Sequence, residues 1–423
     1  MVDIDRRLLP VTRELTTGFR AVVINGPRQA GKSTLVRQLQ NGRGPLVSLD
    51  DPTSLSVALT DPVGFLARLP RHIAIDEFQR GGDALLLSLK RRLDEDRARG
   101  QYVLAGSTRF LTTRRLSETL TGRIAIAELL PLSAGEIRST RTGAHAGSFI
   151  DDVFMESPVD QLLARTPDRL TRADHAEMIA VGGFPEVVLG PTTDRFRRTW
   201  GRSYIETLTA LTNVEQVAEI RRPALVGDLL RQMAARSAQE IVVSDLAREL
   251  RIDEGTVRTY LDILETLYLI RMVPAWSTSH TNRAKKRSVG HVLDTSLACF
   301  ILGVTSKQLA SVDSRWFGPL LESFVVGELV KQLGWSETDA RILQYRDRDQ
   351  REVDVLLEQG NKVVAIEVKA TATPTVSHAR HMAAIRDRVG TRFHLGIVLH
   401  TGSSAVSIGD RLVALPVSAL WSV

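Results

Sequence analysis

The chain has 423 residues, 43% of them hydrophobic and 25% charged, which excludes a disordered polypeptide and is enough for several cores. Its apolar runs are shorter than the roughly 20 residues of a bilayer span, and its charged start excludes a signal peptide. The single cysteine, Cys299, excludes an internal disulfide and is expected to be buried. We therefore expect a cytoplasmic protein with no membrane segment, and its basic excess favours a polyanionic partner.

Residues 20–130 alternate short apolar runs with helical stretches, which is typical of a parallel α/β sheet. The predicted strands are 21–25, 45–49, 72–75, 102–105 and 124–127, and the predicted helices are 32–40 and 84–96. We therefore assign residues 1–132 to an α/β core.

After residue 132 the pattern changes to helices, interrupted by Gly-containing turns, and residues 133–220 are predicted to form a helical lid. Within 221–310, a short helix through Leu250, a tight turn and a helix over 254–267 are typical of a winged helix-turn-helix, with a basic hairpin after it. Residues 311–423 combine a helix at 320–333 with strands at 342–345, 353–358 and 363–368, which predicts a separate small α/β domain.

The strongest motif is GPRQAGKS, which follows an apolar strand and opens a helix, as a Walker A phosphate-binding loop requires. Its glycines let backbone N–H groups converge on phosphate, Lys32 would hold the β and γ oxygens, and Ser33 would bind Mg²⁺. The predicted ATP-binding residues are Gly26, Pro27, Arg28, Gln29, Ala30, Gly31, Lys32, Ser33, Thr34 and Asp76.

Four later residues complete this predicted site. The strand of HIAIDEF ends in Asp76, expected to bind Mg²⁺, and Glu77, expected to be the base that orients the attacking water. Ser107 follows the next strand and is either a γ-phosphate sensor or part of a plain turn. Arg123 is either a surface residue or an arginine that reaches the site of a neighbouring subunit in a homo-oligomer.

The order of these motifs resembles a known family. The stretches VVINGPRQAGKSTLVRQL, IAIDEFQR, LAGSTRFL and LTGRIAIAELLPLS, with GGFPEVVL and GPLLESFVVGEL further on, look like bacterial and archaeal AAA ATPases that carry a C-terminal nuclease-like domain. The resemblance covers nearly the whole chain. It implies the AAA fold and an ATP site, while cellular roles in that family are mostly unassigned.

The predicted winged helix offers Thr256, Arg258 and Thr259 toward a DNA groove. The following stretch to residue 287 lacks carboxylates and carries cations that predict phosphate contacts, namely Arg271, Arg283, Lys285, Lys286 and Arg287. Acidic residues on the same helix oppose DNA binding, and winged helices also serve as lids or protein contacts. DNA is thus the expected partner of residues 271–287, with those alternatives open.

A second constellation lies near the C-terminus. Asp354 and the pair Glu367 and Lys369, which are separated by one residue, resemble the core of the PD-(D/E)XK nucleases, a restriction-endonuclease-like fold. That resemblance implies that Asp354 and Glu367 bind Mg²⁺ and that Lys369 activates water, while Glu322 on the preceding helix is the expected extra acid. The opposing interpretation is a set of ordinary charges at strand ends, and the fold is also used for binding without cleavage.

The sequence thus predicts an ATPase in which nucleotide state moves the lid and winged helix and presents DNA to a metal-dependent nuclease. The alternative is an ATP-switched DNA-binding or regulatory protein whose nuclease fold is catalytically silent.

Overall fold

A computed structural model of the chain describes residues 4–42, 44–106, 120, 122–142, 147–209, 224–277, 283, 286–347 and 349–422. Its backbone falls into two compact units, Met1–Leu132 with Thr266–Tyr268, and Ser133–Glu265 with Leu269–Val423. Among the described residues, no helix has both the length and the apolar character that crossing a bilayer requires. Apart from Thr266–Tyr268, residues 133–423 form one compact unit. Their division into three domains stays a prediction.

The first unit contains a five-stranded parallel sheet in the order β2-β3-β4-β1-β5. The strands are β1 (Ala21–Asn25), β2 (Leu46–Ser48), β3 (Ile73–Asp76), β4 (Tyr102–Gly106) and β5 (Ile124–Glu128). The central strands β1, β3 and β4 are buried throughout, as expected of strands covered on both faces. The predicted α/β core and its strands are confirmed to within two residues.

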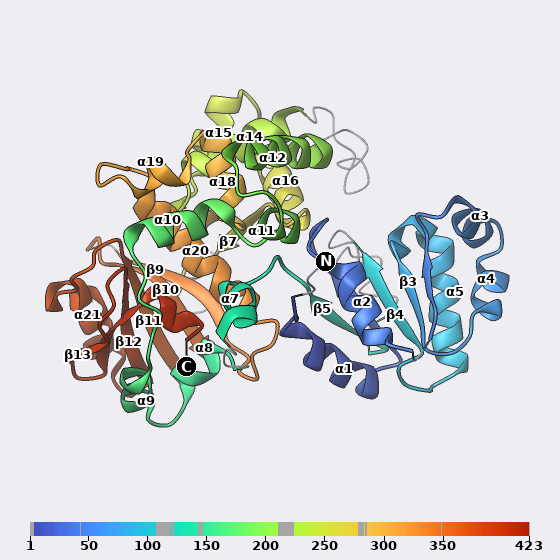
Figure 1. Cartoon of the computed structure of the whole chain (residues 1–423), viewed down its shortest axis with the longest axis horizontal. Helices are drawn as coiled ribbons and strands as arrows, with labels where there is room; N and C mark the ends of the chain where they lie inside the picture. Colours follow the sequence, from blue (N-terminus) through green and yellow to red (C-terminus); the bar gives the residue numbers. More distant parts are fainter. Residues whose placement is uncertain are drawn as a thin grey trace. The chain divides into compact units, whose positions relative to one another are not determined.

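Helices cover both faces of this sheet (Figure 1). They are α1 (Leu8–Gly18), α2 (Lys32–Gln40), α3 (Pro52–Thr60), α4 (Pro62–Arg68), the 3₁₀ turn η1 (Phe78–Gly81) and α5 (Gly82–Glu95). Apolar residues of α1 and α2 pack against one face, and those of α3, α4 and α5 pack against the other. Asp51 and Asp61 accept N–H hydrogen bonds at the starts of α3 and α4, each followed by a proline that suits a first turn.

The second unit begins with helices, as predicted. They are α7 (Ala134–Thr142), α8 (Phe149–Phe154), α9 (Pro158–Ala164), α10 (Arg172–Val181), α11 (Pro185–Leu189) and α12 (Asp194–Thr209). These helices belong to the same compact unit as the C-terminal sheet, and Arg165 donates to the Ala419 carbonyl at 3.1 Å. The lid function assigned to them from the sequence stays a prediction.

Three helices and a small sheet follow, and their assignment as a winged helix stays a prediction. They are α14 (Ala224–Ala235), α15 (Val243–Leu250) and α16 (Glu254–Thr266), with β6 (Gln239–Glu240), β7 (Ile270–Val273) and β8 (Val289–Val292) in the antiparallel order β6-β8-β7. Four leucine and valine side chains of α16 and its end are buried: Val257, Leu261, Leu264 and Leu267.

A six-stranded mixed sheet completes the second unit in the order β13-β14-β12-β11-β10-β9. Its elements are α18 (Thr295–Leu302), α19 (Ser306–Ala310), α20 (Phe317–Gln332), β9 (Arg341–Arg346), β10 (Glu352–Gln359), β11 (Lys362–Lys369), η3 (Val376–Ala379), α21 (Arg380–Val389), η4 (Gly390–Arg392), β12 (Phe393–His400), β13 (Val406–Gly409), β14 (Leu412–Pro416) and η5 (Val417–Leu420). Residues of α21 pack into one core with this sheet, and α8 and α20 contact β11. Cys299, on α18, is buried as predicted, and burial raises the pKa of its thiol to about 12.

One buried carboxylate joins the hairpin after β7 to the six-stranded sheet. Glu358, 3% exposed on β10, accepts hydrogen bonds from Trp276 Nε1 at 2.9 Å and from two guanidinium nitrogens of Arg283 at 2.7 Å each. Arg341 and Arg392 approach the same carboxylate at 3.1 and 3.6 Å. Arg283 was predicted to contact phosphate, and this prediction is wrong, because its guanidinium neutralises Glu358 inside the protein.

Replacing Glu358 by Gln should lower the free energy of unfolding of the second unit by about 3 kcal/mol, since it leaves buried Arg283 without its counter-charge. Urea unfolding followed by tryptophan fluorescence measures this unit alone, because all five tryptophans lie within it. The exposed Asp349→Asn is the matched control. An unchanged midpoint in Glu358→Gln would show that the buried cluster contributes nothing.

The same cluster has a pH signature. Burial raises the pKa of Glu358, but the hydrogen bonds from Arg283 and Trp276 outweigh it and leave that pKa below its ordinary value. Its contribution to stability is therefore complete above the pKa of the unfolded carboxyl and is lost as pH falls through the folded pKa.

Candidate functional site

The loop between β1 and α2 has the backbone that phosphate binding needs. Gln29 and Gly31 have φ values of 61° and 94°, which turn successive N–H groups toward one side before α2 begins. A Cβ on Gly26 would lie 2.0 Å from the Leu129 carbonyl oxygen, so only glycine fits there. The predicted loop Gly26 to Ser33 is thus shaped by its glycines and ends at a helix N-terminus.

Lys32 is the buried cation of this loop. Lys32 is only 6% exposed, and its ammonium donates to the carbonyls of Gly26 at 3.0 Å and Pro27 at 2.8 Å. Burial lowers the pKa of Lys32 to about 8, against the opposing effect of Glu77 and Asp76. An ammonium held by two carbonyls at the start of a helix is poised to exchange them for phosphate oxygens.

The two predicted magnesium residues are in direct contact. The Ser33 hydroxyl donates to Asp76 Oδ2 at 2.7 Å, which joins the start of α2 to the end of β3. Glu77 follows in the left-handed backbone region with φ 51°, rare for a residue with a side chain and often found at functional sites. Its carboxylate accepts a hydrogen bond from the Gln79 side-chain amide.

Two residues of this site were not predicted from the sequence. Buried Arg6 donates to the Ala30 carbonyl inside the loop at 2.8 Å and to the Leu130 carbonyl at 2.7 Å, and so clamps the loop to the chain after β5. Asn25, 1% exposed and paired in register with Gly106, has no hydrogen-bond partner for either polar side-chain atom within the described part of the chain. Their signal was weak, because Arg6 precedes the motif by twenty residues and Asn25 sits inside an apolar strand.

The other predicted residues of the first unit have mixed outcomes. Thr34 lies in the first turn of α2 beside Ser33, and its hydroxyl accepts from Arg37 at 3.2 Å. Ser107 lies outside the described residues. Arg123 donates to both oxygens of Asp94 at 2.5 and 3.1 Å, an ion pair within its own unit that would have to open before the side chain reached another subunit. Its role across an interface stays a prediction.

A second polar cluster lies in the second unit, at the end of the six-stranded sheet. The register pairs Val355 with Ile366, which brings Asp354 on β10 beside Glu367 on β11. Asp354 Oδ2 accepts from the Val368 N–H at 2.7 Å, and Lys369 Nζ donates to Glu367 Oε1 at 2.6 Å. The other oxygen of Glu367 is buried without a hydrogen-bond partner among the described residues.

These charges disturb one another strongly. Burial, followed by the nearby Asp354, raises the pKa of Glu322 well above its ordinary value. Burial and then Glu367 raise the pKa of Asp354 to about 7, and burial also raises the pKa of Glu367. Burial lowers the pKa of Lys369, but Glu367 and Asp354 outweigh it and the net shift is upward. The four predicted residues are therefore electrostatically coupled.

The assignment of Glu322, Asp354 and Glu367 to a metal site stays a prediction. Within the described residues, no group of three or more His, Cys, Asp and Glu side chains is arranged to hold a metal ion. The reason is local, because the Val368 amide occupies one oxygen of Asp354 and the Lys369 ammonium occupies one of Glu367. One buried, unpartnered oxygen of Glu367 is left to fit a cation.

The predicted DNA-facing residues of α16 make local contacts. Thr256 donates its N–H and its hydroxyl to the Asp253 carboxylate, which caps the helix start, and Thr259 donates to the Gly255 carbonyl. Exposed Arg258 pairs with Glu254 at 3.2 Å. Among the hairpin cations, Arg287 is exposed, Arg271 is half-buried, and Lys285 lies outside the described residues.

Comparison with protein families separates the chain into three stretches. Residues 18–138, which include the whole phosphate-binding loop, match a family profile described as an AAA domain. This stretch is therefore similar to an AAA domain. Residues 172–308 match a domain of unknown function (DUF8612), and residues 317–420 match another (DUF4143).

Two relatives match this chain over far more than residues 18–138. An uncharacterized protein of Mycobacterium bovis and one of Mycobacterium tuberculosis are each 26% identical over 397 residues, covering 93% of this chain and 79% of theirs. A Walker-type ATPase of Pyrococcus abyssi is 16% identical with a TM-score of 0.44, covering 71% of this chain and 96% of its own. RuvB of Thermotoga maritima is 15% identical with a TM-score of 0.29, covering 68% and 92%. Neither structural likeness carries an inference about activity.

The lowered pKa of Lys32 predicts that phosphate binding at this loop depends on pH. A phosphate bound to Lys32 favours the ammonium, so binding takes up a proton when the pH exceeds the free-site value of about 8. Affinity for an ATP analogue should fall by about tenfold from pH 7 to pH 9, measured by titration calorimetry. Lys32→Arg, which stays charged, should lose this dependence, and an equal slope in both proteins would contradict the assignment.

Proposed function

We propose that the AAA domain binds ATP together with Mg²⁺ and hydrolyses it. The observation that carries this proposal is the 2.7 Å hydrogen bond between Ser33 and Asp76, formed beside the buried ammonium of Lys32. A hydroxyl and a carboxylate are oxygen ligands of the kind that Mg²⁺ takes together with the phosphates of a nucleotide. The unpartnered amide of Asn25 adds a polar group at the same edge of the sheet.

Each residue has a definable task in this reaction. Lys32 releases the Gly26 and Pro27 carbonyls and holds phosphate oxygens, while the loop N–H groups bind the same phosphates. Bound Mg²⁺ would neutralise developing charge on the phosphates, with Ser33 and Asp76 as its protein ligands. Glu77 is the base that orients and deprotonates the attacking water, and Gln79 holds its carboxylate until then. Ser107 as sensor and Arg123 as an arginine supplied to a neighbouring subunit belong to the same proposal.

Replacing Glu77 by Gln removes the base and keeps the side-chain volume. We expect ATP turnover to fall by roughly 10²-fold or more while nucleotide affinity stays near the wild-type value. Steady-state phosphate release and calorimetry measure the two quantities separately. Asp83→Asn, which removes an acidic residue from the neighbouring α5, is the control. Full turnover in Glu77→Gln would rule out this base.

A second candidate function is metal-dependent cleavage of DNA by the cluster around Asp354. It is supported by the buried, unpartnered oxygen of Glu367 beside Asp354, and by the ammonium of Lys369 at 2.6 Å from the same carboxylate. Asp354 and Glu367 would hold Mg²⁺, Lys369 would position the attacking water, and Glu322 is close enough to affect their charges. The restriction-endonuclease-like fold and the winged helix that would bring DNA to it are part of this proposal.

Incubation of the full chain with linear, circular and single-stranded DNA tests this candidate, with Mg²⁺ or Mn²⁺ and with or without ATP. We expect cleavage that needs the metal and is lost in Asp354→Asn, which removes the charge and keeps the volume. Asp313→Asn, at an exposed position before α20, should cleave like the wild type. Intact DNA under every condition, with ATP turnover preserved, would instead identify a nucleotide-switched binding or regulatory protein.

A further inference from the structure

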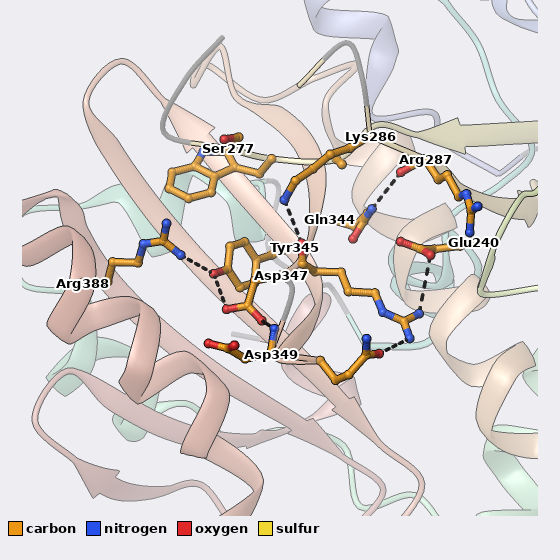
Figure 2. Close-up of a pocket in the computed structure, with 13 residues that line it drawn as sticks. Glu240, Ser277, Lys286, Arg287, Gln344, Tyr345, Asp347, Asp349 and Arg388 are labelled. Carbon is orange, nitrogen blue, oxygen red and sulfur yellow. Dashed lines mark hydrogen bonds and ion pairs between the residues drawn. The ribbon is translucent and has the colours of Figure 1, made fainter. Parts of the chain in front are cut away.

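A cavity of about 930 Å³ opens in the second unit between the hairpin after β7 and the edge strand β9. Figure 2 shows that its side chains come from separate elements, with Lys286 and Arg287 from the hairpin, Tyr345 from β9 and Arg388 from α21. The cavity is comparable in size with ligand pockets of about 300–1,000 Å³.

Each acid of this cavity has an arginine partner. Asp347 and Asp349 lie 3.5 and 3.3 Å from the same Arg351, and Glu240 lies 3.6 Å from Arg346. These pairs leave one carboxylate charge unbalanced, fewer than the free cations of the cavity.

Three cations of the cavity, in contrast, have no carboxylate partner among the described residues. Lys286 Nζ donates to the Arg346 carbonyl at 2.8 Å, and Arg388 donates to the neutral Tyr345 hydroxyl at 3.0 Å. Exposed Arg287 has no side-chain partner in that part of the chain. The cavity thus has an uncompensated positive charge that attracts an anionic ligand.

The sheet register places this cavity near the carboxylate cluster. Arg346 at the end of β9 pairs with Glu352 at the start of β10, two residues before Asp354. β11 pairs antiparallel with β10 and ends at Lys369, so all three strand ends share one end of the sheet. A ligand in the cavity is therefore at the end of the sheet where Asp354, Glu367 and Lys369 lie.

The aromatic rings of the cavity determine what kind of contact is available. Trp276 is 1% exposed and Tyr345 is 3% exposed, and Lys286 lies over the Tyr345 ring at 5.7 Å. Neither ring is free to stack on a base. Recognition must then go through charge, which contacts a phosphate backbone without selecting sequence.

We propose that this cavity binds the phosphodiester backbone of a single nucleic-acid strand through Lys286, Arg287 and Arg388, and that it delivers the strand to the cluster around Asp354. The delivery step rests on the second candidate function, whereas the binding step does not. Its size suits a short stretch of one strand rather than a duplex.

Binding is tested by fluorescence anisotropy with a short labelled DNA single strand of mixed sequence, in EDTA and without nucleotide. Lys286→Ala combined with Arg388→Ala should weaken binding about tenfold or more at low salt. It should also reduce the slope of log affinity against log salt by about 1.4, since each phosphate contact on a single strand contributes about 0.7. The charge reversal Arg287→Glu disturbs no folded contact and should weaken binding in the same direction.

Arg195→Ala combined with Arg202→Ala removes the same charge from exposed positions on α12, outside the cavity, and should bind like the wild type. Wild-type affinity and salt slope in the cavity variants, or equal losses in this control, would overturn the proposal. So would a labelled acidic peptide that binds as tightly as the strand and is lost in the same cavity variants.

The two proposals fail in different ways. Cavity-dependent strand binding without cleavage in Mg²⁺ or Mn²⁺ supports the cavity and contradicts the nuclease. Metal-dependent cleavage that proceeds at the wild-type rate in the cavity variants supports the nuclease and overturns the cavity.

Discussion

The hydrogen bond from the Ser33 hydroxyl to the Asp76 carboxylate is the contact on which the nucleotide site depends. It requires that β1 and β3, separated in the sheet by β4, end at the same edge, which parallel pairing ensures. The glycines of the loop and the carbonyl clamp of Arg6 hold the backbone around it. Because strand packing and not the loop alone sets this geometry, the site is only as well formed as the core beneath it.

The second unit relies on a different constraint, which is the neutralisation of buried charge. Glu358 would be costly to bury alone, and its arginine partners come from the hairpin, from β9 and from the turn before β12. This ties the hairpin to the edge strand, and Trp276 of the same cluster also lines the cationic cavity. At the other end of the same sheet the charges are left incompletely compensated, since the carboxylates there raise one another's pKa. Incomplete compensation of that kind is typical of a functional site.

Local patterns were enough for much of the first unit. Alternating apolar runs and the Walker A motif located β1, α2 and β3, because parallel strands buried on both faces leave a continuous apolar signal. The C-terminal strands were found in the same way, and the register that pairs Asp354 with Glu367 follows from a short hairpin. Arg283 was misassigned because a charge run in a sequence does not show which of its members has a buried partner.

The sequence by itself determined the residue types of the phosphate loop, the acidic end of β3 and the acid–lysine pair on β11, since each is set by neighbours within a few positions. Only the tertiary structure decided which charges stay available. Arg6 reaches the loop from twenty residues upstream, and Arg123 is held by Asp94. Lys286 from the hairpin and Arg388 from α21 line the same cavity although they are far apart in the sequence. Such pairings depend on distances through space, which folding alone brings within the few ångströms where charges act strongly.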